Sequence, residues 1–250
     1  MQAYLTLVRR ELGSHFLSWT GYVVIAAVLF LLGYSFQNLI VALNRDATDR
    51  PITEVFYGTM YFWLILLVAS PIITMRSFAH EKNSGTFETL MTTPVSDFQV
   101  VLAKFTGAML FYALLWLPLL GCLFTVRYYS HDTTILDAGS VISTFIGILL
   151  LGSMYMAMGC FASSMTKSQI IAAMVSFAMG ISIFMLSFLS MSFAGQGGWK
   201  AQMFNHVGLI EHMQDFAQGV IDSRPLIFYL SLTCFFLFLT VKVVESRRWK

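Results

Sequence analysis

The residue types that could do covalent chemistry are scattered along this chain of 250 residues. The sequence has no G-x-x-x-x-G-K-[ST] loop to hold nucleotide phosphates, and no H-E-x-x-H or G-x-S-x-G motif for hydrolysis. Cys122, Cys160 and Cys234 are widely spaced in apolar runs, which is typical of small hydrophobic residues rather than of a disulfide set or zinc site. We therefore expect a protein that is not an enzyme and holds no cofactor, so that any ATP is bound by a separate polypeptide.

Two patterns could be taken for metal sites. His212 and Asp215 are three residues apart and could share a helix face, but two side chains do not make a site. Met154, Met156 and Met158 alternate, and residues two apart point to different faces of a helix. Met is a common filler of membrane helices, so packing explains these residues better than copper binding. We expect no metal.

The most distinctive polar segment covers residues 81–94, between two long apolar runs. Gly85 can cap a helix that places Glu88 at its third position, where a carboxylate interacts favourably with the helix dipole. Pro94 must end this helix, because proline disfavours the α conformation in the residue before it. The segment is therefore predicted to form a short helix over about 84–93.

Three apolar side chains lie on this polar segment, at Phe87, Leu90 and Met91. Exposed apolar groups flanked by charge suggest a surface on which another protein docks. They could equally lie against the membrane surface or against helices of the same chain. The spacing alone does not separate these possibilities.

The composition places the chain in a membrane. It is 57% hydrophobic and 11% charged, whereas soluble domains carry about 25% charged residues. Six segments reach the ~20 apolar residues that a span needs, and in lipid each must be helical. They cover about 18–38, 55–76, 98–126, 140–162, 169–193 and 225–244. The predicted fold is an all-α integral membrane protein with one domain over residues 1–250.

The basic residues predict its orientation. With both termini inside, ten of the 15 Lys and Arg lie on the inner side and five on the outer side, as the positive-inside rule requires. This puts the termini and residues 81–94 in the cytoplasm. Lys104, just inside the third span, is expected to snorkel to the membrane surface as an anchor. The centres of the spans hold no acid–base pair, which disfavours a proton-coupled carrier.

Two amphipathic segments flank the spans. Residues 1–16 carry an apolar face and are expected to lie in the membrane interface. Residues 203–221 are expected to form an outer interfacial helix, or a re-entrant part of a gate. Its apolar stripe includes Met213, Phe216 and Val220, which we take as candidate outer-gate residues.

Small residues recur every four positions in the fifth span, at Ala172, Ser176 and Gly180. Such a face lets two helices approach closely. It predicts a helix-packing contact, either within one chain or between two.

Residues 73–90, ITMRSFAHEKNSGTFETL, resemble the "MRsfaeEkrsGTlElLlt-P" signature of type-2 ABC transporter permeases. Residues 95–105, VSDFQVVLAKF, resemble the start of the third helix in that family, and residues 215–224 and 247–249 match its C-terminal part. The resemblance covers nearly the whole chain and is greatest to the gliding-motility permease subunit and its relatives. Two residues depart mildly from the pattern: Phe87 stands where an aliphatic residue is common, and Met91 stands where Leu is usual.

This resemblance implies a six-helix fold with an N-terminal elbow helix and a cytoplasmic coupling helix. It also implies the residues that couple the chain to its ATPase: Glu81, Gly85, Thr86, Phe87, Glu88, Leu90 and Met91. The partners implied are two copies of an ABC ATPase subunit, a second permease that is the same chain or a paralogue, and membrane lipid.

The expected function is that of a permease subunit of an ATP-driven exporter in a bacterial inner membrane. One alternative is a membrane scaffold that uses ATPase-driven motion to act on envelope proteins without carrying a solute. Another is a channel or carrier independent of ATP, which the coupling signature disfavours. Resemblance at the level of the fold does not fix the substrate.

Overall fold

The computed structural model describes residues 2–45, 52–87, 95–130, 137–193 and 206–246. All the regular structure in these ranges is helical, and six helical stretches are long and apolar enough to cross a membrane. This confirms the all-α, six-span prediction. The helices are α1 (Gln2–Phe16), α2 (Trp19–Arg45), α3 (Ile52–Tyr57), α4 (Met60–Thr74), α5 (Ala79–Ser84), α7 (Asp97–Ser130), α8 (Ala138–Met165), α9 (Gln169–Phe193), α11 (Leu209–Ala217) and α12 (Ser223–Ser246).

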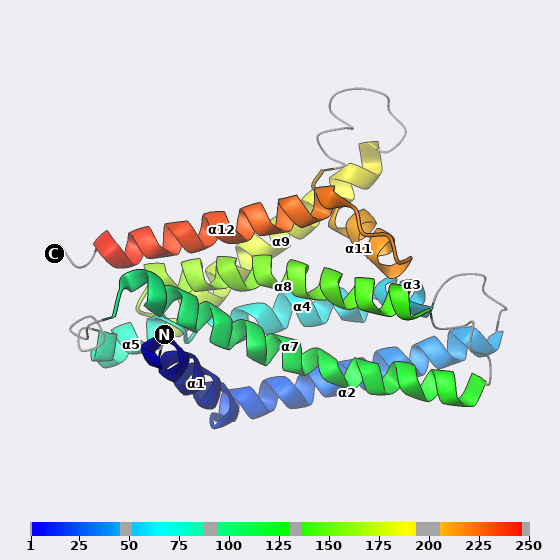
Figure 1. The fold of residues 1–250 in the computed structure, drawn as a ribbon, viewed down its shortest axis with the longest axis horizontal. Helices are drawn as coiled ribbons and strands as arrows, with labels where there is room; N and C mark the ends of the chain where they lie inside the picture. Colours follow the sequence, from blue (N-terminus) through cyan, green and yellow to red (C-terminus); the bar gives the residue numbers. More distant parts are fainter. Residues whose placement is uncertain (1, 46–51, 88–94, 131–136, 194–205, 247–250) are drawn as a thin grey trace.

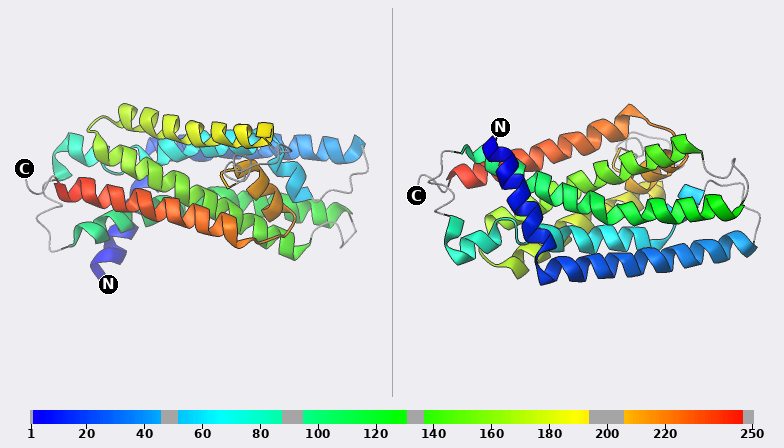
Figure 2. Two further views of the ribbon diagram at one scale, coloured as in Figure 1. Left: turned by 90° about the horizontal axis from the view of Figure 1, so that it is seen from above. Right: turned by 60° about the horizontal axis from the view of Figure 1, so that its bottom comes forward.

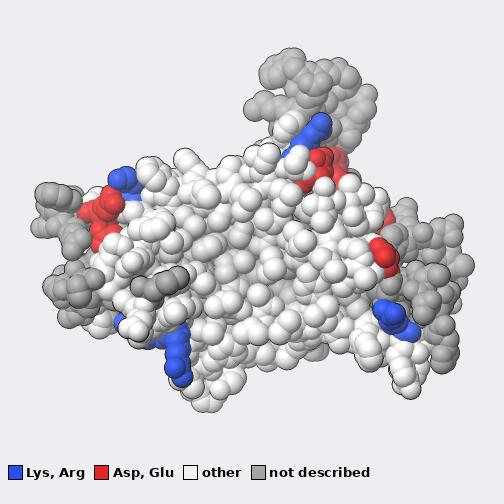
Figure 3. Space-filling model, in the orientation of Figure 1, with Lys and Arg blue, Asp and Glu red and all other residues white. Residues whose placement is uncertain are grey.

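The long helices run lengthwise beside one another, and both chain termini lie at the same end of the bundle (Figure 1). We call this the terminal end; it also holds α1 and α5. The short helices α3 and α11 lie at the opposite end, as the turned views show (Figure 2). On the face drawn in Figure 3, charged side chains gather at the two ends and the middle is covered by uncharged residues. This distribution suits a protein whose middle faces lipid.

Helix α8 is the centre of the bundle, packing against α4, α7, α9, α11 and α12. At three glycines of α8, a side chain from a neighbouring helix fills the space that a Cβ atom on the glycine would occupy. Tyr112 of α7 lies against Gly152, Thr74 of α4 lies against Gly159, and the Phe216 ring of α11 lies 2.9 Å from the position of a Cβ on Gly147. Glycine at these positions is therefore required for close approach between helices.

The helix bounds differ from the predicted ones in two places. The second predicted span, about 55–76, contains a break at Gly58 and Thr59 that separates α3 from α4. The Thr59 hydroxyl donates to the Phe56 carbonyl at 2.6 Å, and this contact closes the turn. The outer helix, predicted over 203–221, is the nine-residue α11, and residues 203–205 of that prediction lie outside the described ranges.

Candidate functional site

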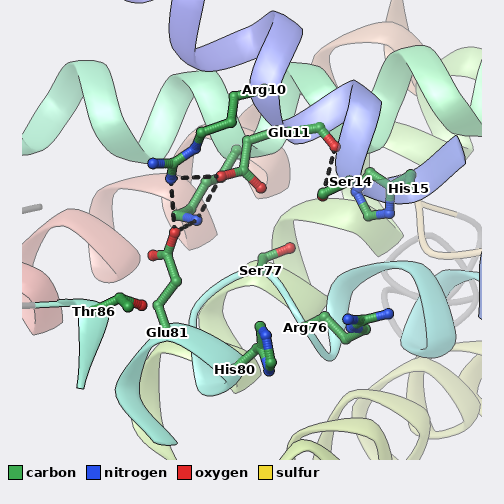
Figure 4. A pocket seen from close by; sticks show the side chains of 10 residues that line it. Arg10, Glu11, Ser14, His15, Arg76, Ser77, His80, Glu81 and Thr86 are labelled. Carbon is green, nitrogen blue, oxygen red and sulfur yellow. Dashed lines mark hydrogen bonds and ion pairs between the residues drawn. The ribbon is translucent and has the colours of Figure 1, made fainter. Parts of the chain in front are cut away.

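Four charged side chains meet at the terminal end, and we call them the ion cluster: Arg10 and Glu11 from α1, Glu81 from α5 and Lys104 from α7 (Figure 4). The Lys104 Nζ lies 2.9 Å from one oxygen of Glu11 and 2.9 Å from one oxygen of Glu81. The Arg10 guanidinium reaches the same Glu81 oxygen at 2.9 Å and Glu11 at 3.3 Å. Two cations and two carboxylates thus tie together three helices that are distant in the sequence.

The cluster is shielded from water on its α7 side. Lys104 is only 3% exposed, and its ammonium group lies 5.3 Å from the centre of the Phe78 ring. Glu11 is buried because it follows Val8 by three residues on the face of α1 that packs against α7. Burial raises the pKa of Glu11, but the Lys104 ammonium and Arg10 guanidinium outweigh burial and hold it below its ordinary value.

Helix α5 and the turn before it are fastened to the end of α8 by hydrogen bonds between side chains and backbone groups. The Ser163 hydroxyl accepts the Phe78 and Ala79 N–H groups at 3.1 Å each and donates to the Met75 carbonyl at 3.1 Å. The buried Lys82 ammonium donates to the Ser164 carbonyl. Movement of α5 would therefore reach α8 directly, and α1 and α7 through the ion cluster.

Helix α5 ends at Gly85, whose φ of 75° is a left-handed conformation that glycine adopts at little cost. After this single turn residue, Thr86 and Phe87 are helical again, and the Phe87 ring lies 5.1 Å from the Lys82 ammonium. This glycine lets the polar segment leave the helix in a new direction.

A cavity of about 580 Å³ opens beside the ion cluster. It is lined by Arg10, Glu11, Ser14, His15, Arg76, Ser77, His80, Glu81, Thr86 and Lys104. The His15 ring stacks on Phe111 with ring centres 5.2 Å apart. Burial lowers the pKa of His15, helped by Arg76 and Lys104 and opposed by Glu11, so the neutral imidazole is favoured there.

These side chains do not form a nucleophile–base arrangement: the cluster consists of ion pairs that join helices, at the end of six membrane-spanning stretches. Comparison with known protein families decides the class of protein. Residues 21–240 match the family described as "ABC-2 family transporter protein". The chain belongs to the ABC-2 transporter family. It is a multi-pass membrane protein and a permease component of an ABC transporter, in a family whose members associate with an ABC ATPase. No curated protein sequence matches the chain.

In this ABC-2 permease, the predicted coupling residues fall into two groups. Glu81, Gly85, Thr86 and Phe87 are described, and Glu81 belongs to the ion cluster. Phe87 is buried in a small apolar group of this chain that includes Phe78 and Val101, so its ring packs on the permease's own helices. The remaining three coupling residues lie outside the described ranges, as does most of the predicted helix over 84–93: Glu88, Leu90 and Met91.

Sequence reasoning missed the roles of two residues of the ion cluster in this ABC-2 permease. The expectation that Lys104 snorkels to the surface is wrong: it is buried and bridges two carboxylates. Glu11 was not singled out, although its spacing from Val8 and Leu12 puts it on the apolar face of α1. When each of two apolar helix faces carries one charge of opposite sign, the two charges are expected to pair with each other. An isolated charge buried on such a face would cost several kcal/mol of folding free energy.

The predicted outer-gate residues of the permease differ in how far they are buried. Met213 and Phe216 are almost fully buried, whereas Val220 is 52% exposed. The buried pair packs α11 into the end of the bundle, where the Thr53 hydroxyl donates to the Ala217 carbonyl at 2.7 Å. His212, considered for a metal, lies edge-on to the rings of Phe228 and Tyr229. Helix α11 packs against α3, α8 and α9.

The predicted helix-packing residues Ala172, Ser176 and Gly180 are all buried. The Tyr155 hydroxyl of α8 donates to the Gly180 carbonyl at 3.2 Å, and the ring lies 2.9 Å from where a Cβ on Gly180 would be. At Gly180 the small-residue face thus packs within one chain.

Proposed function

We propose that this chain is the permease subunit of an ATP-driven exporter whose motion is set by a separate ABC ATPase. The observation that carries the proposal is the Lys104 bridge, which joins α5, α1 and α7 next to the segment that resembles the family's coupling helix. In this proposal two ATPase subunits dock on residues 84–93 of two permeases, each either this chain or a paralogue.

The proposed cycle transmits ATPase closure through α5. Because Ser163 and Lys82 fasten α5 to α8, a displacement of the docking segment moves the central helix of the bundle. Because Glu81 holds Lys104, the same displacement moves α1 and α7. The spans then exchange between inward- and outward-facing arrangements, and α11 with α3 forms the lid over the outer end.

The orientation in this proposal is that of the positive-inside rule, with both termini in the cytoplasm of a bacterium and the chain in its inner membrane. Cysteine replacements at Ser84 and at Asp132, probed in intact cells with an impermeant thiol reagent, test it. We expect labelling at position 132 alone. Labelling at position 84 without labelling at 132 would overturn the orientation.

Docking is tested with the Glu88→Lys variant of the permease, reconstituted with its ATPase. The reversed charge should uncouple the complex: the variant is inserted and purified normally, but the permease no longer stimulates ATP hydrolysis. A matched reversal at Glu54, in α3 at the opposite end, should leave stimulation unchanged. Full stimulation in Glu88→Lys shows that the docking surface lies elsewhere.

The non-transporting scaffold is the second candidate, since its spans and ion cluster would be the same. Reconstituted complex in liposomes separates the two. ATP-dependent movement of a lipid or solute across the bilayer supports the exporter. ATP hydrolysis that moves neither, but changes an envelope protein bound at the outer end, supports the scaffold.

A further inference from the structure

The cavity beside the ion cluster has two chemically different halves. On one side Glu11 and Glu81 are held by Lys104 and Arg10. On the other side lie His15, Arg76, Ser77 and His80, which we call the donor half (Figure 4). Its guanidinium, imidazole and hydroxyl groups can all donate hydrogen bonds, and no carboxylate of the described residues forms an ion pair with Arg76.

Arg76 is held in place by a neutral contact. Its Nη1 donates to the Thr20 hydroxyl at 2.8 Å, so its positive charge is not neutralised by that partner. The planar guanidinium presents further N–H groups in a geometry that fits two oxygens of a phosphate. His80 is also oriented, because its Nδ1 contacts the Gln169 amide nitrogen at 3.0 Å and leaves Nε2 for another partner.

The size and the surroundings of the cavity fit a ligand at the membrane surface. Its volume of about 580 Å³ lies within the range of ~300–1,000 Å³ that small-ligand sites occupy. Leu17, in the turn between α1 and α2, is 84% exposed, and Trp19, the first residue of α2, is 88% exposed. Exposed tryptophan is enriched at the level of lipid headgroups, which places the donor half where phospholipid phosphates lie.

We propose that the donor half binds a phosphate group, carried by a phospholipid headgroup or by a free anion. The phosphate accepts hydrogen bonds from Arg76, His80 and His15, while the ion cluster closes the far side of the cavity. Such a ligand would lie against α1, the turn between α4 and α5, and α5 together. None of the donor-half residues belongs to the docking segment over 84–93, although Thr86 of that segment also lines the cavity. The proposal does not depend on the direction of transport.

The test uses the purified permease in detergent, titrated with dioleoyl-phosphatidylglycerol and observed by native mass spectrometry. We compare Arg76→Gln and His80→Gln with Lys167→Gln, which removes an exposed positive charge at the same end. Arg76→Gln should weaken binding about tenfold, as expected for loss of a charge-assisted hydrogen bond. His80→Gln, at an exposed position that tolerates change, should weaken it about threefold, and Lys167→Gln should bind as the natural chain does.

Two further arms identify the source of the phosphate. Dioleoylglycerol, which lacks the phosphate, should not be retained. Competition by millimolar inorganic phosphate supports the site and assigns it to a free anion, whereas retention of phosphatidylglycerol in that phosphate supports it and assigns it to lipid. Equal binding by Arg76→Gln, His80→Gln and Lys167→Gln, or equal retention of dioleoylglycerol, would overturn the proposal.

Discussion

The two ends of this bundle hold their short helices by opposite means. At the terminal end, α1 and α5 are joined to α7 through charged groups that converge on Lys104. At the opposite end, α11 is held by apolar side chains and by hydroxyl contacts to its carbonyls, with the Phe216 ring placed over Gly147. One end therefore depends on charge and geometry, and the other on volume.

This difference indicates which conditions change the stability of the contacts at each end. Ion pairs respond to pH, to charge substitution and, where exposed, to salt. Packed rings respond to changes in side-chain volume and hardly to pH or salt.

The largest expected effect is that of Lys104→Ala. It leaves Glu11 and Glu81 without their buried cation, and breaking a buried pair in this way costs about 3–5 kcal/mol. Unfolding of the purified permease in detergent, followed by circular dichroism against temperature, should show a strongly lowered midpoint.

The matched control for Lys104→Ala is Lys242→Ala, which removes an exposed pair with Glu245 at 2.8 Å. Exposed pairs contribute about 0–1 kcal/mol, so this variant should unfold almost as the natural chain does. Equal midpoints for the two variants would remove the distinction between the ends, because the buried bridge would then stabilise no more than a surface pair.

Gly147→Ala probes the opposite end and should destabilise by about 1–3 kcal/mol, the range for overpacking a tight contact. The added Cβ would lie 2.9 Å from the Phe216 ring. Gly33→Ala in α2 is the control, since nothing lies within 4 Å of its Cβ position; it should be neutral or stabilising by up to about 1 kcal/mol. In the double variant Gly147→Ala, Phe216→Ala the ring is absent, so its loss should be smaller than the sum of the two single losses. Additive losses would show that the ring is not what the methyl group meets.

The pH dependence should come from the terminal end. The pKa of Glu11 is lowered in the fold, so its stabilising contribution is present above its ordinary value of 4.5 and is lost as the pH falls through the folded value. The pKa of His15 is also lowered, from 6.5, so the fold loses stability as the pH falls below 6.5 and the unfolded chain binds the proton first. The free energy of unfolding should be measured at a series of pH values for the natural chain and for His15→Gln. The substitution should remove the loss of stability just below pH 6.5 and leave the loss at acid pH. An unchanged profile in His15→Gln would assign the titration to another group.

The smallest expected effect is that of Arg10→Gln. The Arg10 side chain is 53% exposed, so its pairs with Glu81 and Glu11 should contribute no more than about 1 kcal/mol, and high salt should remove most of that. Unfolding midpoints at low and high ionic strength measure this. A salt-insensitive loss as large as that of Lys104→Ala would place Arg10 among the buried contacts.

Much of the fold follows from the sequence because lipid leaves few alternatives. A run such as 169–193 is long and apolar enough to span, and its backbone must then be helical. The break before α4 was missed because Gly58 and Thr59 lie in an apolar stretch, where the length of the run outweighed the local turn. Helix α11 is amphipathic from its sequence, but only the position of Gly147 shows that its apolar face is covered by α8.

The candidate site was less predictable, because it is built from residues 93 positions apart. Glu81 was found through the resemblance to type-2 ABC permeases, which names the segment but not its partners in this chain. From its local sequence, Lys104 was expected to be a surface anchor, and Glu11 was not singled out. Their pairing depends on how α1 crosses α7, and the helical spacing of either segment alone does not contain that crossing.

Three of the glycines of α8, Gly147, Gly152 and Gly159, have a consequence for the order in which the chain assembles during synthesis. Thr74 and Tyr112, which fill the spaces at Gly159 and Gly152, precede α8 in the chain, so both partners are already made when α8 leaves the ribosome. Phe216, which fills the space at Gly147, follows it by one whole span. The newly inserted α8 can thus settle on α4 and α7 at once, whereas its third recess stays open until α11 has been made. Only α12, the last span, is made after all three recesses have their partners.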